Sequence, residues 1–144
     1  MMVNIIVTGH GEFSSGLLTA LKLIAGEQPN IVAVNFLEMD TTEALNKKLK
    51  AQIEQGGQEI IVLADLLGGS PFKESLLLKM EFSDKNIEVL SGTNFPMLLS
   101  AALTDSDNAN ELARELVDEG KNAVSMFEQG GVKIGKSDDE EDGI

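Results

Sequence analysis

The residues best suited to chemistry are the single histidine of this 144-residue chain and a glycine-rich acidic segment far from it in sequence. His10 lies in Thr8-Gly9-His10-Gly11, and Asp65 opens the segment Asp65-Leu66-Leu67-Gly68-Gly69-Ser70-Pro71-Phe72. A carboxylate that accepts a hydrogen bond from one imidazole nitrogen makes the other nitrogen a better nucleophile. Glycines let backbone N–H groups approach an anion, and a helix begun by proline adds its positive end. This combination suits a histidine that takes and releases a phosphoryl group.

The apolar pattern places these residues at the ends of two strands. Residues 3–8 and 59–64 form short apolar runs followed by glycine-containing segments, which is typical of buried strands. Two more runs of this kind predict strands at residues 31–36 and 87–90. Helical spacing and capping residues predict helices over about 13–25, from Thr41 or Thr42 to 55, and over about 71–80, 96–103 and 107–120. The short apolar segment 123–127 fits either a fifth strand or the end of a helix.

Four alternations of strand and helix predict an α/β fold with a doubly wound, four-stranded parallel sheet and helices on both faces. In the common strand order 2-1-3-4, the first and third strands are neighbours at the point where ligands usually bind. We therefore expect His10, on a glycine-flanked turn after the first strand, to meet Asp65 and the Gly68-Gly69-Ser70 loop.

Each of these residues also has a purely structural interpretation. A lone loop histidine usually has no task, and Asp65 at a strand end could only cap the following turn. Gly68 and Gly69 could form no more than a turn, and Ser70 could be an N-cap alone. The segment Gly92-Thr93-Asn94 would lie at the same sheet edge or merely form a loop.

The composition limits the possible classes of function. The absence of cysteine excludes disulfides and thiolate chemistry, and no apolar stretch approaches the roughly 18 residues that span a bilayer. Without a basic leader, a cytoplasmic protein is expected. A net charge of -13 disfavours nucleic acid and anionic membranes as partners. Since the dinucleotide, Walker and zinc patterns are missing, we expect no cofactor and no metal.

The chain resembles the mannose-type enzyme IIA domains of the bacterial phosphoenolpyruvate-dependent sugar phosphotransferase system. The glycine-flanked His10 alone is a weak match, but the D-x-x-G-G-[ST]-P-F segment at this distance from it is specific. The matching segments run in order over residues 1 to about 128: Ile5-Ile6-Val7-Thr8-Gly9-His10-Gly11, Gly26-Glu27-Gln28, Val62 to Phe72, and Gly92-Thr93-Asn94-Phe95-Pro96-Met97-Leu98.

The resemblance implies that His10 accepts a phosphoryl group from the histidine-containing phosphocarrier protein and passes it to a histidine of enzyme IIB. Enzyme IIB then phosphorylates the sugar, so this protein would act on the membrane sugar permease only indirectly. Asp65 would hydrogen-bond the histidine, and Gly68 to Ser70 would form part of the active-site rim. The resemblance also implies a homodimer that exchanges an antiparallel fifth strand, a role that residues 123–127 could fill.

Several features refine this expectation. We expect residues 1–129 to form the IIA domain and residues 130–144 to form an acidic, disordered tail, so that enzyme IIB is a separate protein. Leu66 stands where some members carry a hydroxyl residue, which argues against a side-chain contact to phosphate at that position. The short form and the ending Asp142-Gly143-Ile144 favour the N-acetylgalactosamine or another amino-sugar subgroup.

Three other functions stay open at this point. A similar domain donates phosphoryl groups to a dihydroxyacetone kinase. A non-catalytic module could use His10 only to contact an anion or another small molecule. A serine hydrolase could use Ser70 with His10 and Asp65, although the usual G-x-S-x-G elbow is missing.

Overall fold

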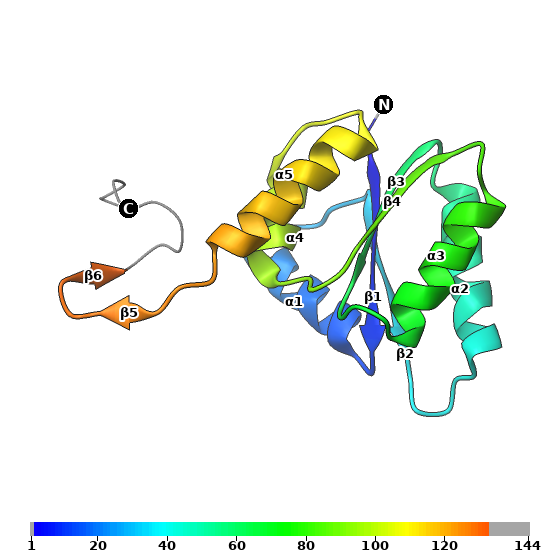
Figure 1. Ribbon diagram of the computed structural model, residues 1–144, viewed down its shortest axis with the longest axis horizontal. Coiled ribbons are helices and arrows are strands. Elements are labelled where there is room, and N and C mark those ends of the chain that lie inside the picture. Colours follow the sequence, from blue (N-terminus) through cyan, green and yellow to red (C-terminus); the bar gives the residue numbers. More distant parts are fainter. Residues whose placement is uncertain (1, 133–144) are drawn as a thin grey trace.

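A parallel sheet forms the centre of the protein in the computed structural model, which describes residues 2–132 (Figure 1). Its strands are β1 (Asn4–His10), β2 (Ile31–Phe36), β3 (Glu59–Ala64) and β4 (Asn86–Leu90). They lie in the order β2-β1-β3-β4, and every neighbouring pair is parallel. The predicted α/β class and strand order are confirmed.

Within residues 2–132, five helices cover the two faces of the sheet (Figure 1). One face carries α1 (Phe13–Ala25), α4 (Phe95–Leu103) and α5 (Ala109–Asn122), and the other carries α2 (Thr42–Gln55) and α3 (Ser70–Glu81). The predicted helices are confirmed, with ends that move by less than one turn. Within residues 2–132, every helix is too short or too polar to cross a membrane.

The central strand β1 serves both layers of the core. Ile5 and Val7 belong to the apolar cluster under α1, α4 and α5, whereas Ile6 belongs to the cluster under α2 and α3. Side chains alternate between the two faces of a strand, so a strand covered on both sides is apolar at successive positions. This explains why β1 and β3 are continuous apolar runs rather than alternating ones.

His10 is the last residue of β1, and the prediction that it lies on a turn after the strand is wrong. The parallel pairing with β2 continues through His10↔Phe36, and the Gly11 N–H then donates to the Phe36 carbonyl at 2.7 Å. The turn begins only at Gly11, whose φ of 59° lies in the left-handed region that favours glycine. The scaffold therefore holds the backbone of His10 by strand pairing.

The last described residues, 123–132, form a C-terminal arm that extends away from the sheet and its helices (Figure 1). It contains the short strands β5 (Phe127–Glu128) and β6 (Gly131–Val132), which pair antiparallel with each other. A short fifth strand is thus confirmed, although residues 123–126 are not part of it, and within residues 2–132 it pairs with β6. Of the tail predicted at residues 130–144, β6 occupies part, and residues 133–144 lie outside the described residues.

Candidate functional site

His10 and Asp65 meet at the carboxyl ends of β1 and β3. The Nδ1 atom of His10 lies 2.8 Å from the Asp65 Oδ2 atom, and the backbone N–H of His10 donates to the same oxygen at 2.9 Å. The histidine side chain is 48% exposed, whereas that of Asp65 is only 9% exposed. A mostly buried carboxylate therefore orients a ring that is about half exposed to solvent.

The protonation of Asp65 decides which nitrogen of His10 can react. Its partial burial by itself raises the pKa, but hydrogen bonds from the His10 backbone, the His10 ring and the Leu66 N–H outweigh this effect and lower it below the ordinary value. An ionised carboxylate can only accept hydrogen bonds, so Nδ1 of His10 must be the donor. The Nε2 atom of the neutral ring then carries the free lone pair.

The loop after β3 brings the start of α3 against this free nitrogen. Gly69 is the N-cap residue of α3, Ser70 is its first residue and Pro71 lies in its first turn. A Cβ atom on Gly69 would lie 2.8 Å from Cε1 and 3.4 Å from Nε2 of His10. The first N–H groups of a helix have no acceptor within the helix and form its positive end, so they can hold an anion beside Nε2.

Gly68 makes this approach possible through its backbone. Its φ of 86° lies in the left-handed region, where a side chain would be strained. Ser70 is not the N-cap, contrary to one of its two interpretations, because Gly69 takes that position. The structure therefore brings all five predicted site residues, His10, Asp65, Gly68, Gly69 and Ser70, to one edge of the sheet.

Sequence reasoning missed the part that Gly9 plays. A Cβ atom there would lie 2.9 Å from both Cβ and Cγ of Asp65 and 2.6 Å from Cδ2 of Phe13. Asp65 therefore occupies the space that a side chain at residue 9 would fill, and this lets its carboxylate reach His10. A glycine inside a strand pattern often marks such a close approach, so this signal was present in the sequence.

The end of β2 frames the other side of the histidine. The rings of Phe36 and His10 meet edge to face, with centroids 5.8 Å apart. Asn35 fixes the start of α1, because its Oδ1 atom accepts from the Ser14 hydroxyl at 2.6 Å and from the Ser15 N–H at 3.2 Å. Nothing in the local sequence distinguishes these two residues from ordinary strand residues.

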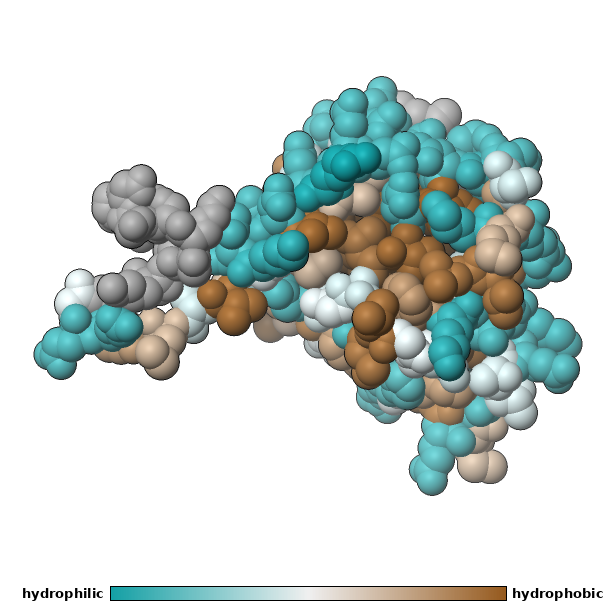
Figure 2. Space-filling view, in the orientation of Figure 1, coloured by the Kyte–Doolittle hydropathy of each residue, from teal (hydrophilic) through white to brown (hydrophobic). Residues whose placement is uncertain are grey.

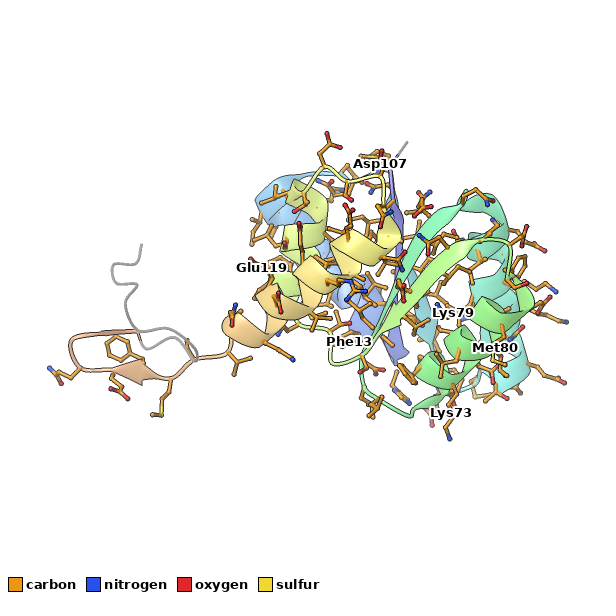
Figure 3. The ribbon with its side chains drawn as sticks, turned by 45° about the horizontal axis from the view of Figure 1, so that its top comes forward. Phe13, Lys73, Lys79, Met80, Asp107 and Glu119 are labelled. Atoms are coloured by element: carbon orange, nitrogen blue, oxygen red, sulfur yellow. The ribbon has the colours of Figure 1, made fainter. Side chains whose placement is uncertain are left out.

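The surroundings of the site are partly apolar. Leu66 and Leu67 are 52% and 71% exposed, and the Cγ atom of Leu66 lies 3.7 Å from the position of a Cβ on Gly69. Figure 3 labels Phe13 and Lys73, which lie near the end of the molecule where β1 terminates, whereas Asp107 lies at the opposite end. The segment Gly92-Thr93-Asn94 also joins this edge, where Asn94 caps α4.

Metal chemistry has no obvious ligand set here. Among residues 2–132, no three histidine, aspartate or glutamate side chains gather into a possible metal site.

Comparison with known proteins gives consistent matches. The family model described as the PTS system fructose IIA component matches residues 4–127. The PTS system fructose-specific EIIA component of Bacillus subtilis is 29% identical over 100 residues, which cover 68% of this chain and 67% of that protein. The PTS system mannose-specific EIIAB component of Escherichia coli is 28% identical over 131 residues, which cover 88% of this chain but only 40% of that longer protein.

A solved structure shows the same fold. The crystal structure of the phosphotransferase system component EIIA from Streptococcus agalactiae superimposes with a TM-score of 0.82 at 36% sequence identity, and the match covers 85% of this chain and 95% of the other. The chain therefore belongs to the mannose-type EIIA family of sugar phosphotransfer components of the phosphotransferase system, whose family model matches residues 4–127.

Proposed function

We propose that His10 is a phosphohistidine carrier, which accepts a phosphoryl group from the histidine-containing phosphocarrier protein and passes it to a separate enzyme IIB. The observation that carries this proposal is the hydrogen bond between Nδ1 of His10 and the Asp65 carboxylate. It leaves Nε2 as the nucleophile, and Nε2 lies against Gly69 at the start of α3. The family membership supports the same pathway.

The proposed transfer uses the His10 ring, the Asp65 carboxylate and the backbone at the start of α3. The lone pair of Nε2 forms a bond to phosphorus while the bond between phosphorus and the donor histidine breaks, and the donor nitrogen keeps that electron pair. The His10 ring gains positive charge, which the Asp65 carboxylate 2.8 Å from Nδ1 stabilises. The backbone of Gly68, Gly69 and Ser70 holds the phosphoryl oxygens. Transfer to enzyme IIB reverses these steps with a different acceptor.

Mass spectrometry of the intact protein tests this proposal. The protein is mixed with phosphoenolpyruvate, enzyme I and the phosphocarrier protein, and we expect one acid-labile phosphate that maps to His10. His10→Ala should fold normally, because the side chain is exposed, and should carry no label. Gly16→Ala is the matched control, since a Cβ at that position meets open space on α1. An unlabelled wild-type protein, with both upstream proteins active, would refute the carrier role.

The other functions are not favoured. A dihydroxyacetone kinase donor would use the same histidine, and phosphoryl transfer from labelled protein to enzyme IIB or to the kinase subunit separates the two pathways. A serine hydrolase would need the Nε2 atom of His10 to accept a hydrogen bond from the Ser70 hydroxyl, whereas the ring hydrogen bond found within residues 2–132 is the one between Nδ1 and Asp65. A panel of ester substrates tests this reading directly. The binding-module reading predicts anion binding without a covalent label.

We also infer a homodimer in which the C-terminal arm covers a second copy. The arm exposes Val124, Met126 and Phe127 at 68%, 70% and 75%. The strand β4 lies at the edge of the sheet, and Figure 2 shows hydrophobic surface between α3 and α5 on that side. Among the exposed apolar side chains of α3 are Leu77 and Met80.

Sedimentation of the full chain tests the dimer. We expect a dimer that Phe127→Asp converts to monomer. Leu23→Asp is the control, because Leu23 is 89% exposed on α1 and lies outside the arm. A monomeric wild-type protein, or a dimer that survives Phe127→Asp, would contradict the role of the arm.

The transported sugar stays a prediction. The amino-sugar subgroup rests on the length and ending of the sequence, whereas two of the named relatives act in fructose and mannose systems. Uptake of labelled N-acetylgalactosamine, fructose and mannose by cells with and without the gene distinguishes these possibilities.

A further inference from the structure

We propose that Thr93 is a positioning residue for the Asp65 carboxylate, and through it for the His10 ring. Thr93 lies in the loop between β4 and α4 and is 7% exposed. Its hydroxyl donates to the carbonyl oxygen of Ala64 at 2.7 Å, and its backbone N–H donates to the same oxygen at 3.2 Å. Ala64 is the residue immediately before Asp65.

The orientation of the Ala64 carbonyl determines where the Asp65 backbone lies. The peptide group between the two residues is planar, so the direction of the Ala64 carbonyl fixes the plane that leads to the Asp65 Cα atom. On one side, Ala64 pairs with Thr8 of β1. On the other side, the pairing of β3 with β4 ends at Leu63↔Leu90, one residue too early. The two Thr93 hydrogen bonds therefore connect the Ala64 carbonyl to the β4 side of the sheet, directly before Asp65.

The loop that carries Thr93 is itself anchored. The next residue, Asn94, accepts the Met97 N–H at 3.1 Å through Oδ1 and donates to the Gly120 carbonyl at 3.0 Å through Nδ2. At Gly120, a Cβ atom would lie 2.5 Å from the Met97 Cγ atom, so α5 packs directly on the start of α4. A rigid loop can transmit its position to Ala64, whereas a mobile loop could not.

The Asp65 carboxylate must be held in a fixed orientation, because one of its oxygens accepts two hydrogen bonds from His10. A single oxygen, Oδ2, receives both the His10 ring at 2.8 Å and the His10 N–H at 2.9 Å. A small rotation of the carboxylate weakens both bonds together and removes the preference for the Nδ1–H tautomer. This inference deepens the proposed function, on which its effect on transfer rate rests, but the geometry of the pair can be measured without any transfer.

The experiment compares Thr93→Val, which keeps the shape and removes the hydroxyl, with Thr93→Ser, which keeps the hydroxyl. Thr8→Val is the matched control, because the Thr8 hydroxyl is also buried and also donates to a strand carbonyl, that of Val34, at 2.9 Å. Nitrogen NMR of the single histidine reports its tautomer, and carbon NMR, assigned with Asp65→Asn, reports the titration of Asp65. Thr93→Ala repeats the test should the valine variant fail to fold.

We expect Thr93→Val to shift the His10 tautomer away from Nδ1–H, to raise the pKa of Asp65 toward its ordinary value and to slow phosphoryl acceptance about tenfold. Thr93→Ser should restore all three, and Thr8→Val should lose stability without moving the tautomer or the Asp65 titration. An unchanged tautomer and an unchanged Asp65 titration in Thr93→Val would overturn the inference. A wild-type protein that accepts no phosphoryl group would refute the proposed function and leave the two NMR results to decide the role of Thr93.

Discussion

Gly69 approaches the His10 imidazole so closely that a Cβ atom would lie 2.8 Å from the Cε1 atom of the ring. Real Cβ contacts are essentially never so short, so any side chain at this position must displace the ring or the start of α3. The contact therefore places the Cε1–Nε2 edge of the histidine against the helix end that would hold a phosphoryl group in the proposed transfer.

Gly69→Ala is expected to slow phosphoryl acceptance by about 10²-fold, because a displacement of roughly 1 Å at the reacting atom costs that much. The measurement is the initial rate of labelling of His10 by the phosphocarrier protein. Gly16→Ala is the control, since the same substitution on the exposed side of α1 meets open space and should stabilise the helix by about 1 kcal/mol. Equal rates in Gly69→Ala and wild type would contradict the proposed position of the phosphoryl group.

Asp65→Asn is expected to slow transfer by about 10²-fold while the fold persists, because the amide carries no charge to stabilise the ring and does not enforce the Nδ1–H tautomer. Single-turnover labelling kinetics measure this effect. Asp40→Asn is a matched control, since Asp40 accepts a hydrogen bond from the Lys48 ammonium at 2.9 Å and from the Leu37 N–H at 2.8 Å. If both variants lost the same amount of activity, the role of Asp65 at His10 would be disproved.

Gly9→Ala is expected to destabilise the protein by about 1–3 kcal/mol and to separate His10 from Asp65. The added Cβ would lie 2.9 Å from the Asp65 side chain and 2.6 Å from the Phe13 ring, and contacts this short force a shift. Urea unfolding measures the loss of stability, and the histidine tautomer measures the separation. A variant with wild-type stability and tautomer would show that the site can absorb the extra atom.

The stability of the protein is expected to fall with acidification through the titration of Asp65. Its pKa is lower in the folded protein than the ordinary value of 3.8, so the unfolded chain takes up a proton first. The stabilisation is therefore complete above that value and is lost as the pH falls through the folded pKa. Urea unfolding at a series of pH values should show a shallower acid loss in Asp65→Asn than in wild type. Parallel curves would mean that Asp65 titrates alike in both states.

The amino-acid sequence predicts the four strands and places His10 and Asp65 at the ends of two of them, because apolar runs end at these residues. The common strand order 2-1-3-4 then brings the carboxyl ends of the first and third strands together at one edge of the sheet. The tertiary structure decided the rest. That His10 belongs to the strand depends on its pairing with Phe36, and the need for Gly9 and Gly69 depends on atoms more than 50 residues away in the chain. A glycine inside a strand pattern can signal such a contact but does not name its partner, because the partner depends on how separate elements pack rather than on the preference of any one segment.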